Sequence, residues 1–372
     1  MVNDEAAYLR RILDLAVSVQ QIPSPTFHEQ QCAAFLKDIF LEEGLKDVAI
    51  DAAGNLFGRL PGTHEVSPLV ISAHVDTVFP ANTNLACEVN EETIHGASIG
   101  DNSLGVAGLL GILWRLRKNR IVLPGDVWFV ANTGEEGLGN LEGMRCVVDR
   151  FGSQPRAYLI LEGMALGQII HRGLGVVRFR ITMKTTGGHS WADYGKPSAI
   201  HELAKLIALL DGIPVPEEPR ASLNVGVIAG GVSINTIAPQ AWLEVDLRSV
   251  DADTLTELSR RVTELAESFR LPGVDVLIEK IGQRPAGGIP ANHPLVRTAE
   301  NALRAEGFTP RLNIASTDAN IPLSKGLPAV CIGLTTGKGA HTTDETIDVP
   351  PLAKGMNQVY RLVLSLFGVN PA

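Results

Sequence analysis

Two residues that can hold a metal ion stand near the end of one apolar run. The run covers residues 68–78 and reads Pro-Leu-Val-Ile-Ser-Ala-His-Val-Asp-Thr-Val. His74 and Asp76 lie two residues apart near its end. In a β-strand, residues i and i+2 point to the same face, and we therefore expect the imidazole and the carboxylate to emerge side by side. This pair suits a metal-bound histidine whose second ring nitrogen is held by a carboxylate. The same pattern also fits a half-buried strand whose last polar residues meet solvent, so the pair alone leaves both interpretations open.

Further acids and a second histidine share the same kind of position, at the end of an expected strand or the start of an expected helix. They are Asp101, Glu135, Glu136, Glu162 and His341. In open α/β sheets ligands bind beyond the carboxyl ends of the strands, so residues far apart in sequence can converge there. Taken singly, Asp101 could be a helix cap and Glu162 a surface group at a strand end. We do not expect all of these alternatives to hold at once.

Two histidines and three carboxylates form a mixed nitrogen and oxygen donor set, which suits divalent zinc, cobalt or manganese. If one carboxylate bridges two ions, the site becomes a two-metal centre with about 3.5–4 Å between the ions. The adjacent Glu135 and Glu136 can then have different roles, because one can bind metal while the other takes the proton from metal-bound water. The sequence therefore predicts two divalent ions per chain, most simply zinc.

The composition is that of an ordinary globular protein and excludes some classes of partner. The chain has 372 residues, of which 45% are hydrophobic and 20% charged, and its length favours two domains. The formal net charge is -9 and no dense Lys/Arg stretch occurs. Nucleic acid and anionic membrane are therefore not expected as partners.

The sequence predicts a cytoplasmic protein. Its first residues, Met-Val-Asn-Asp-Glu-Ala-Ala-Tyr, lack the charged-then-apolar pattern of a signal peptide, and the longest apolar stretch, 104–114, fits a buried helix better than a membrane span. The cysteines are widely spaced without a Cys-x-x-Cys pair, so we expect reduced and mostly buried thiols at Cys32, Cys87, Cys146 and Cys331.

The first part of the chain alternates helices with nearly continuous apolar strands. We expect helices over residues 5–20 and 27–43 and from Asp101, as its N-cap, to about Lys118, and strands over 48–50, 55–59, 69–78, 126–133 and 157–162. After residue 290 the alternation resumes, with helices over 294–306 and 351–367 and strands over 311–314 and 329–334. This pattern predicts an α/β sheet covered on both faces.

From about residue 173 the pattern changes to strands that alternate apolar and polar residues, as expected for a sheet with one face in water. Strands over 176–184, 222–229, 240–248 and 274–280 and helices over 198–210 and 253–269 follow the order β-α-β-β-α-β, which is ferredoxin-like. We therefore predict a discontinuous catalytic domain of residues 1–172 and 288–372, with residues 173–287 inserted as a second domain.

Four motifs resemble those of a large metallopeptidase family, metallopeptidase family 20. Its members include acetylornithine deacetylase, succinyl-diaminopimelate desuccinylase, aminoacylase, peptidase T and glutamate carboxypeptidase. The motifs are Ser72-Ala-His-Val-Asp-Thr-Val78, Gly100-Asp-Asn-Ser-Leu-Gly105, Asn132-Thr-Gly-Glu-Glu-Gly137 and Gly339-Ala-His-Thr342. The resemblance covers nearly the whole chain and implies a mixed-sheet, zinc-exopeptidase-like catalytic domain with an inserted lid or dimerisation domain.

The resemblance also implies a role for each residue of the set. His74, Asp101 and Glu162 match the ligands of one metal, with Asp101 bridging to a second metal. Glu136 and His341 match the ligands of that second metal. Asp76 resembles the carboxylate that braces His74, and Glu135 resembles the general base that activates the bridging water and then protonates the leaving amine.

In the inserted domain, Gly187-Gly-His-Ser190 resembles the lid histidine motif of the family. In dimeric members that histidine reaches the active site of the partner subunit and helps to polarise the scissile carbonyl, which is the role implied for His189. Asn235 and Arg248 resemble residues that grip a substrate carboxylate, and an arginine fork suits that task. Arg248 could instead be a surface charge and His189 a turn residue. The other histidines are expected to be ordinary surface or helix residues: His28, His64, His95, His171, His201 and His293.

The leading hypothesis is a two-metal hydrolase that cleaves an amide bond in short peptides, as a peptidase-T-like or carboxypeptidase-like exopeptidase. In the family that the chain resembles, a glutamate at the position of Glu162 is more usual in carboxypeptidases and deacylases, which implies a substrate with a free α-carboxylate. The segment 316–320 looks closer to peptidase-T-like members. The alternative is an N-acyl-amino-acid deacylase of the acetylornithine deacetylase or aminoacylase type. A non-catalytic binding protein and a two-metal phosphoesterase are further readings, although the sequence lacks a basic phosphate clamp. We also expect a homodimer through residues 173–287, because the sheet edge there is free to pair with a copy of itself.

Overall fold

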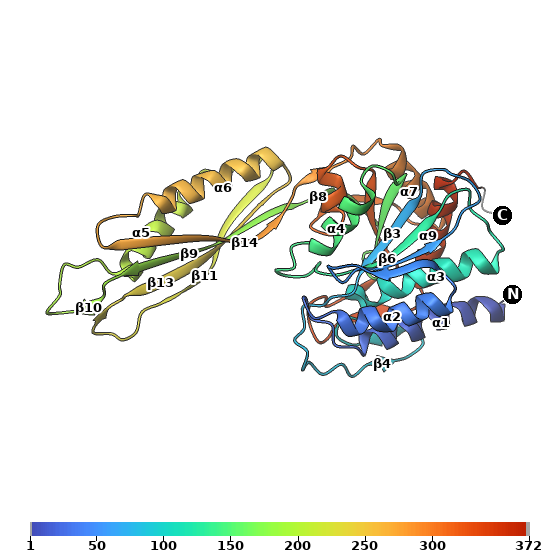
Figure 1. The fold of residues 1–372 in the computed structure, drawn as a ribbon, viewed down its shortest axis with the longest axis horizontal. Coiled ribbons are helices and arrows are strands. Elements are labelled where there is room, and N and C mark those ends of the chain that lie inside the picture. Colours follow the sequence, from blue (N-terminus) through green and yellow to red (C-terminus); the bar gives the residue numbers. More distant parts are fainter. Residues whose placement is uncertain (1, 370–372) are drawn as a thin grey trace. The chain divides into compact units, whose positions relative to one another are not determined.

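The computed structural model describes residues 2–369 and divides into two compact units (Figure 1). The first unit consists of Met1–Gly173 and Gly288–Ala372, and the second of Leu174–Gly287. Among the described residues, no helix combines the length and apolar character that crossing a membrane requires.

A mixed sheet of nine strands runs through the first unit. Its four central strands are parallel and lie in the order β6 (Val127–Asn132), β3 (Leu69–His74), β7 (Ala157–Glu162) and β17 (Ala329–Gly333). Because these strands run the same way, their carboxyl ends meet at one edge of the sheet, and the segments that leave them start close together. The outer strands are β1 (Lys46–Ile50) and β2 (Leu56–Leu60) beyond β6, and β8 (Gln168–Gly173), β15 (Gly287–Gly288) and β16 (Arg311–Ala315) beyond β17.

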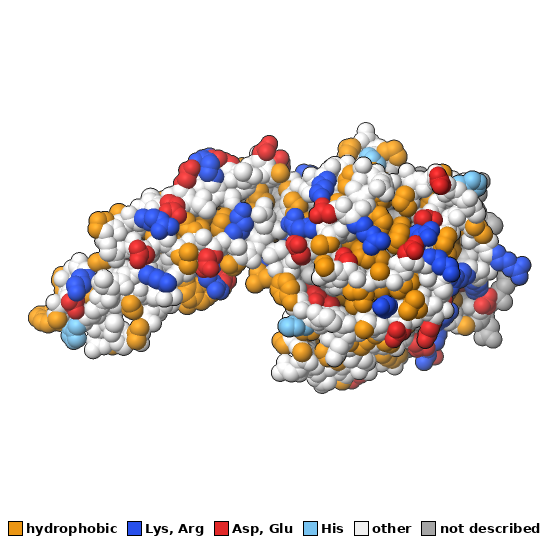
Figure 2. Space-filling view, in the orientation of Figure 1, with side chains coloured by type: hydrophobic (Ala, Val, Ile, Leu, Met, Phe, Trp, Pro, Cys, Tyr) orange, Lys and Arg blue, Asp and Glu red, His pale blue; other side chains and the backbone are white. Residues whose placement is uncertain are grey.

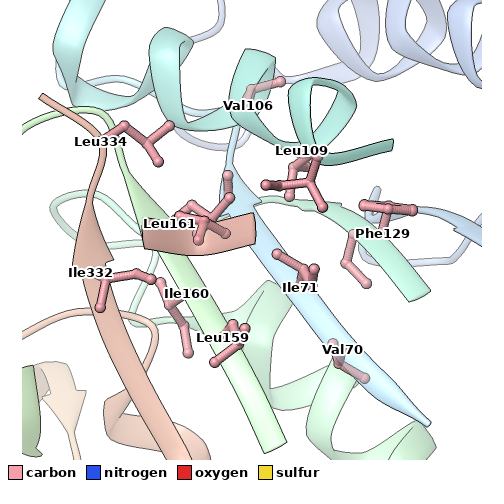
Figure 3. Packing of buried hydrophobic residues seen from close by; sticks show 14 of the residues in the cluster. Val70, Ile71, Val106, Leu109, Phe129, Leu159, Ile160, Leu161, Ile332 and Leu334 are labelled. Atoms are coloured by element: carbon pink, nitrogen blue, oxygen red, sulfur yellow. The ribbon is translucent and has the colours of Figure 1, made fainter. Parts of the chain in front are cut away.

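The central strands are covered on both faces, since every residue of β3 is buried. Helix α3 (Leu104–Lys118) is apolar almost all round, which is typical of a helix enclosed by protein. Figure 3 shows Leu109 of this helix on the side that faces Ile71 of β3, and both residues belong to the buried core. A Cβ at Gly108 would lie 2.4 Å from Leu334 Cδ1, so any larger residue there would require the Leu334 side chain to move.

The start of α3 differs from the sequence prediction, which placed Asp101 at the N-cap. The helix begins at Leu104 with Ser103 as its N-cap, and Asp101 has non-helical dihedrals, φ -118° and ψ 83°. The prediction was wrong because the carboxylate of Asp101 faces two imidazoles, with Oδ1 3.2 Å from His74 Nε2 and Oδ2 3.1 Å from His341 Nε2. The amide of Asp101 donates to Glu345 Oε1 at 2.8 Å.

The expected strand over 69–78 is also shorter than predicted, since it ends at His74. Asp76 lies in the following loop, and Thr77 forms an isolated bridge with Pro25. The relation between His74 and Asp76 is therefore set by a turn of the chain rather than by the pleat of a strand.

The remaining elements of the first unit surround this sheet. Helix α4 and strand β8 were missing from the sequence prediction, as were the strands of a small antiparallel sheet, which are too short to show a period. The small sheet has the order β18 (Gly337–Lys338), β19 (Thr346–Asp348), β5 (Thr93–His95) and β4 (Glu88–Val89). The helices are α1 (Val2–Gln20), α2 (Gln30–Glu42), α4 (Glu142–Phe151), α7 (Pro294–Ala305), α8 (Asn320–Ser324) and α9 (Leu352–Leu366).

The second unit has the ferredoxin-like order of elements that the sequence predicted. Its sheet is antiparallel, with the order β11-β13-β9-β14, and two helices, α5 and α6, pack on it. Two short strands, β10 (Gly188–His189) and β12 (Thr236–Ile237), pair with each other beside it. The main elements are β9 (Gly175–Thr185), α5 (Ala199–Asp211), β11 (Ala221–Gly230), β13 (Gln240–Ser249), α6 (Ala252–Glu267) and β14 (Val274–Arg284).

The alternating pattern of this unit separates an apolar face from a polar one. On β9 and β13, Ile181 and Leu243 are buried in the core, whereas Arg180 and Glu244 form an ion pair on the other face. A buried apolar residue at every second position is what a half-buried strand requires.

Two smaller expectations can be compared directly with the structure. The four cysteines are free, but only Cys32 and Cys331 are buried, while Cys87 and Cys146 are partly exposed. His171 was expected on the surface or in a helix. It is instead buried in β8, because its Nδ1 bonds to the Ile289 carbonyl oxygen at 2.7 Å.

Candidate metal centre

The carboxyl ends of the central strands bring the predicted site residues of the first unit together. His74 is the last residue of β3, Glu162 is the last residue of β7, and Asn132 at the end of β6 lies in register with His74. The loop after Asn132 carries Glu135 and Glu136. His341 comes from the loop between β18 and β19, and Asp101 from the segment before α3.

These residues form two groups of potential ligands that share Asp101. The ligand atoms of His74, Asp101 and Glu162 all lie within 4.8 Å of one another, and so do those of Asp101, Glu136 and His341. Asp101 Oδ1 is 3.2 Å from His74 Nε2, and Asp101 Oδ2 is 3.1 Å from His341 Nε2. The two oxygens of one carboxylate thus face two different imidazoles.

This donor set fits a pair of divalent metal ions. Each group supplies one imidazole nitrogen and oxygens of two carboxylates, which is a suitable set for zinc, cobalt or manganese. A third group joins His74, Glu135 and Glu136 within the same 4.8 Å limit, so the buried carboxylate of Glu135 lies beside both donor groups.

The carboxylate of Asp76 holds the loop that carries the two adjacent glutamates. Its oxygens accept hydrogen bonds from the amides of Glu135 at 2.9 Å and Glu136 at 2.8 Å, and from Thr26 Oγ1 at 2.9 Å. His74 Nδ1 instead bonds to the main-chain oxygen of Asp76 at 3.0 Å, and its nearest Asp76 carboxylate oxygen is 3.6 Å away. The expected brace on His74 is thus made mainly by the main chain of Asp76, and its carboxylate fixes Glu135 and Glu136.

Two further buried side chains hold the main chain around Asp101 and Glu162. Glu345 Oε1 accepts hydrogen bonds from the amides of Gly100 at 2.6 Å and Asp101 at 2.8 Å. Asn102 grips the strand end on both sides of Glu162, since its Nδ2 donates to the Leu161 oxygen and its Oδ1 accepts from the Gly163 amide, each at 2.9 Å.

Sequence reasoning missed these supporting residues, together with a buried pair at the end of β6. There Asn132 Nδ2 donates to Asp318 Oδ2 at 2.6 Å, and burial raises the pKa of Asp318 to about 7. Asn102 and Glu345 stand next to or near predicted ligands, which could have drawn attention to them. Nothing in the local pattern around Asp318 indicates that its side chain reaches β6.

The carboxylates of the site favour protons on its two imidazoles by raising their pKa values. Hydrogen bonding to Asp101, followed by the charge of Glu136, raises the pKa of His341 to about 9 against the effect of its partial burial. Burial opposes the charge on His74, yet its contact with the Asp101 carboxylate and the nearby carboxylates of Asp76 and Glu162 raise the pKa of its imidazole well above the ordinary value. Burial, followed by the charge of Asp101, raises the pKa of Glu136 to about 7.

The second unit holds the other predicted site residues. His189 and Asn235 lie together, because Ser190 N donates to the Asn235 oxygen at 3.0 Å and His189 pairs with Thr236. Arg248 is elsewhere in this unit. It lies near the far end of β13, opposite Val176, and its Nε donates to Asp246 at 2.7 Å.

Comparison with known proteins gives a consistent result. The family model of Peptidase family M20/M25/M40 matches residues 70–365. Succinyl-diaminopimelate desuccinylase from Corynebacterium glutamicum is 25% identical over 358 residues, which cover 94% of this chain and 93% of that protein. The crystal structure of a tripeptidase from Staphylococcus aureus superposes with a TM-score of 0.83 at 24% identity, covering 97% of this chain and 99% of that one. The crystal structure of a dinuclear metal binding peptidase from Bacillus subtilis gives a TM-score of 0.71 at 18% identity, and the match covers 98% of this chain and 100% of that one.

The protonated imidazoles predict how metal binding depends on pH. A metal ion must displace the proton that His341 retains up to about pH 9, so binding should release protons and tighten as the pH rises. We expect zinc to release at least about one proton per chain near pH 7.5, and its apparent affinity to rise roughly tenfold per pH unit from about pH 7 to 8.5. Calorimetric titration of chelator-stripped protein in two buffers of different ionisation enthalpy measures both quantities.

A control variant shows whether the released proton comes from a histidine of the donor groups. His64→Ala removes a histidine outside the donor groups and should leave the proton release unchanged, whereas His341→Gln should reduce it. Zinc binding without proton release in the unmodified protein would contradict the assignment of His341 as a protonated ligand.

Proposed function

The chain belongs to peptidase family M20/M25/M40, and from this membership we propose that it is a two-metal exopeptidase that hydrolyses amide bonds in short peptides. Members of this family are metal-dependent hydrolases. The observation that carries the proposal is the position of Asp101, whose two oxygens lie 3.2 Å and 3.1 Å from the imidazoles of two separate donor groups.

In this proposal the two donor groups hold two ions of zinc, with cobalt or manganese as alternatives. His74, Asp101 and Glu162 would hold the first ion, and Asp101, Glu136 and His341 the second. Ions bound there would polarise the scissile carbonyl and lower the pKa of water.

In this proposal Glu135 is the general base. Its carboxylate is buried beside His74 and Glu136, and its amide is fixed by Asp76. In the proposed reaction Glu135 takes a proton from the attacking water and gives it to the departing amine nitrogen. His189 donates a hydrogen bond to the oxygen of the scissile carbonyl.

The adjacent glutamates should therefore respond differently to substitution. Glu135→Gln should leave the metal content near normal, while activity falls by roughly two to four orders of magnitude through loss of the base. Glu136→Gln should lose metal from one position. Elemental analysis of both purified variants, combined with activity assays, measures the difference. If Glu135→Gln empties a position and Glu136→Gln does not, the two roles are reversed.

An N-acyl-amino-acid deacylase is the second candidate function. It is favoured by the similarity to the desuccinylase of Corynebacterium glutamicum, which covers nearly the whole of both chains. The substrates of both candidate functions carry a carboxylate. We propose that Asn235 and Arg248 bind this group. A cytoplasmic location remains a prediction from the sequence.

A substrate panel tests the proposed function and separates the two candidates. Metal-loaded protein should hydrolyse short peptides with free termini faster than N-acetyl or N-succinyl amino acids, and a chelator should abolish the activity reversibly. Nitrophenyl phosphate, the substrate of a two-metal phosphoesterase, should not be hydrolysed. Preference for the acylated compounds would favour the deacylase, and full activity without any divalent metal would overturn both candidates.

We also propose that the protein is a homodimer formed through the second unit. Strand β11 lies at an edge of its sheet and exposes Val227 and Ile228, while the helix α5 exposes Ile200 and Leu209. A long apolar edge strand is a template for pairing with another chain, and two copies related by a two-fold axis can satisfy each other. In this arrangement His189 of one chain would serve the metal centre of the other.

A mixing experiment tests the shared site. Glu135→Ala chains and His189→Ala chains should each be inactive, but a mixed dimer contains one site with both residues intact. After complete exchange of equal amounts, activity should recover to about a quarter of the unmodified level, because half of the dimers are mixed and each has one working site. Differently tagged chains show whether exchange has occurred. Exchange without recovered activity would place His189 in the site of its own chain or outside catalysis.

A further inference from the structure

The most exposed large hydrophobic side chains of the described chain gather around His189. Trp191 is 87% exposed and Tyr194 90%, and Val232 and Ile234 are the other two of the four most exposed. They belong to two loops, residues 187–196 and 231–237, which are joined by the pairing of β10 with β12. We call these two loops the tip. In Figure 2, hydrophobic side chains lie near a histidine at the end of the unit where Figure 1 labels β10.

The tip holds His189 in one tautomer. Its Nδ1 accepts hydrogen bonds from the amides of Trp191 at 3.2 Å and Ala192 at 3.3 Å, so the ring proton must sit on Nε2. Asp193 closes the same loop, because its Oδ2 accepts from the His189 amide at 2.8 Å. The loop therefore presents an Nε2–H donor with the Trp191 residue directly beside the imidazole.

The tip offers little charge to a bound group. Its single carboxylate, Asp193, and its single amine, Lys196, form an ion pair of 2.7 Å with each other. Asn235 Oδ1 accepts a hydrogen bond from Ser233 Oγ at 3.0 Å, which leaves the amide of Asn235 as a neutral donor. A ligand of the tip thus meets neutral hydrogen-bond donors and large apolar side chains.

We propose that the tip selects substrates that carry an apolar side chain next to the carbonyl bound by His189. This inference rests on the proposed function, since it takes the hydrogen bond from His189 Nε2 to the scissile carbonyl as its starting point. Trp191 and Tyr194 follow His189 by two and five residues on the same loop, and both side chains are almost fully exposed. They are therefore available to pack on an apolar group of a substrate whose carbonyl accepts from Nε2. Burial of that group against two aromatic rings favours leucine-like or phenylalanine-like residues over acidic ones.

A set of dipeptides measures this preference. The unmodified, metal-loaded protein is assayed for kcat/KM on Leu-Gly, Gly-Leu, Asp-Gly, Gly-Asp and Gly-Gly, so that both positions around the amide are sampled. We expect leucine to be preferred over aspartate and glycine at one position. Trp191→Ala and Tyr194→Ala should each lower kcat/KM for that leucine peptide about tenfold and for Gly-Gly less than about twofold.

A control variant and two physical measurements make the result specific. Leu271→Ala truncates a half-exposed leucine of the same unit outside the tip, and it should leave all five values unchanged. Metal content and oligomeric state are measured for every variant. Equal losses on all peptides, or dissociated dimers with an unchanged ratio of leucine to aspartate peptides, would overturn the inference and place the tip in a subunit contact. If the metal-loaded unmodified protein hydrolyses none of the peptides, the proposed function is wrong and the inference falls with it.

Discussion

The mutual repulsion of carboxylates at one edge of a sheet is the constraint on which the rest of this structure depends. Asp101, Glu136 and Glu162 lie in a largely enclosed site, where burial penalises each charge and every neighbouring charge adds to the cost. Positive charge on the two imidazoles offsets part of this repulsion, and divalent ions would offset it more completely. The parallel strands bring these acids together, because their carboxyl ends hold the main chain of His74 and Glu162 at the same edge of the sheet.

Such a site requires a main chain that cannot relax away from it. Asp76 and Glu345 are themselves buried acids, and each binds two successive amides of a segment that carries site residues. The uncharged side chain of Asn102 holds the main chain on both sides of Glu162 in a similar way, through hydrogen bonds to Leu161 and Gly163. The supporting layer thus fixes ligand positions through backbone amides and carbonyls, which leaves the ligand side chains free to face the centre.

The parts of this arrangement that could be predicted from sequence are those governed by periodicity. Apolar runs located β3, β7 and β17, and the rule that parallel strands end at one edge brought His74, Glu162 and His341 together. The rest depends on contacts between residues distant in sequence. The bond from Asp101 to Glu345 spans 244 positions, and no local pattern could have indicated it. The role of the Asp76 carboxylate was missed for the same reason, because its partners lie about sixty residues away.

Two histidines of the chain show how one local bond decides what an imidazole can do. The Nδ1 of His74 meets a carbonyl oxygen two residues later and donates to it, so Nε2 is the nitrogen that can act as a ligand once a metal ion displaces its proton. The Nδ1 of His189 meets amides two and three residues later and must accept, so Nε2 carries the proton and can act only as a donor.

The two donor groups also differ in how firmly their histidines are anchored. His74 is buried at the end of a central strand, whereas His341 has a side chain that is 56% exposed and comes from a loop between two very short strands. Ordering such a loop costs conformational entropy that a strand end has already lost. If the two donor groups hold ions as proposed, the ion at the His341 group would leave the protein at a lower chelator concentration than the ion at the His74 group. If catalysis needs both ions, activity would rise gradually with the concentration of free metal and would follow the occupancy of the weaker of the two positions.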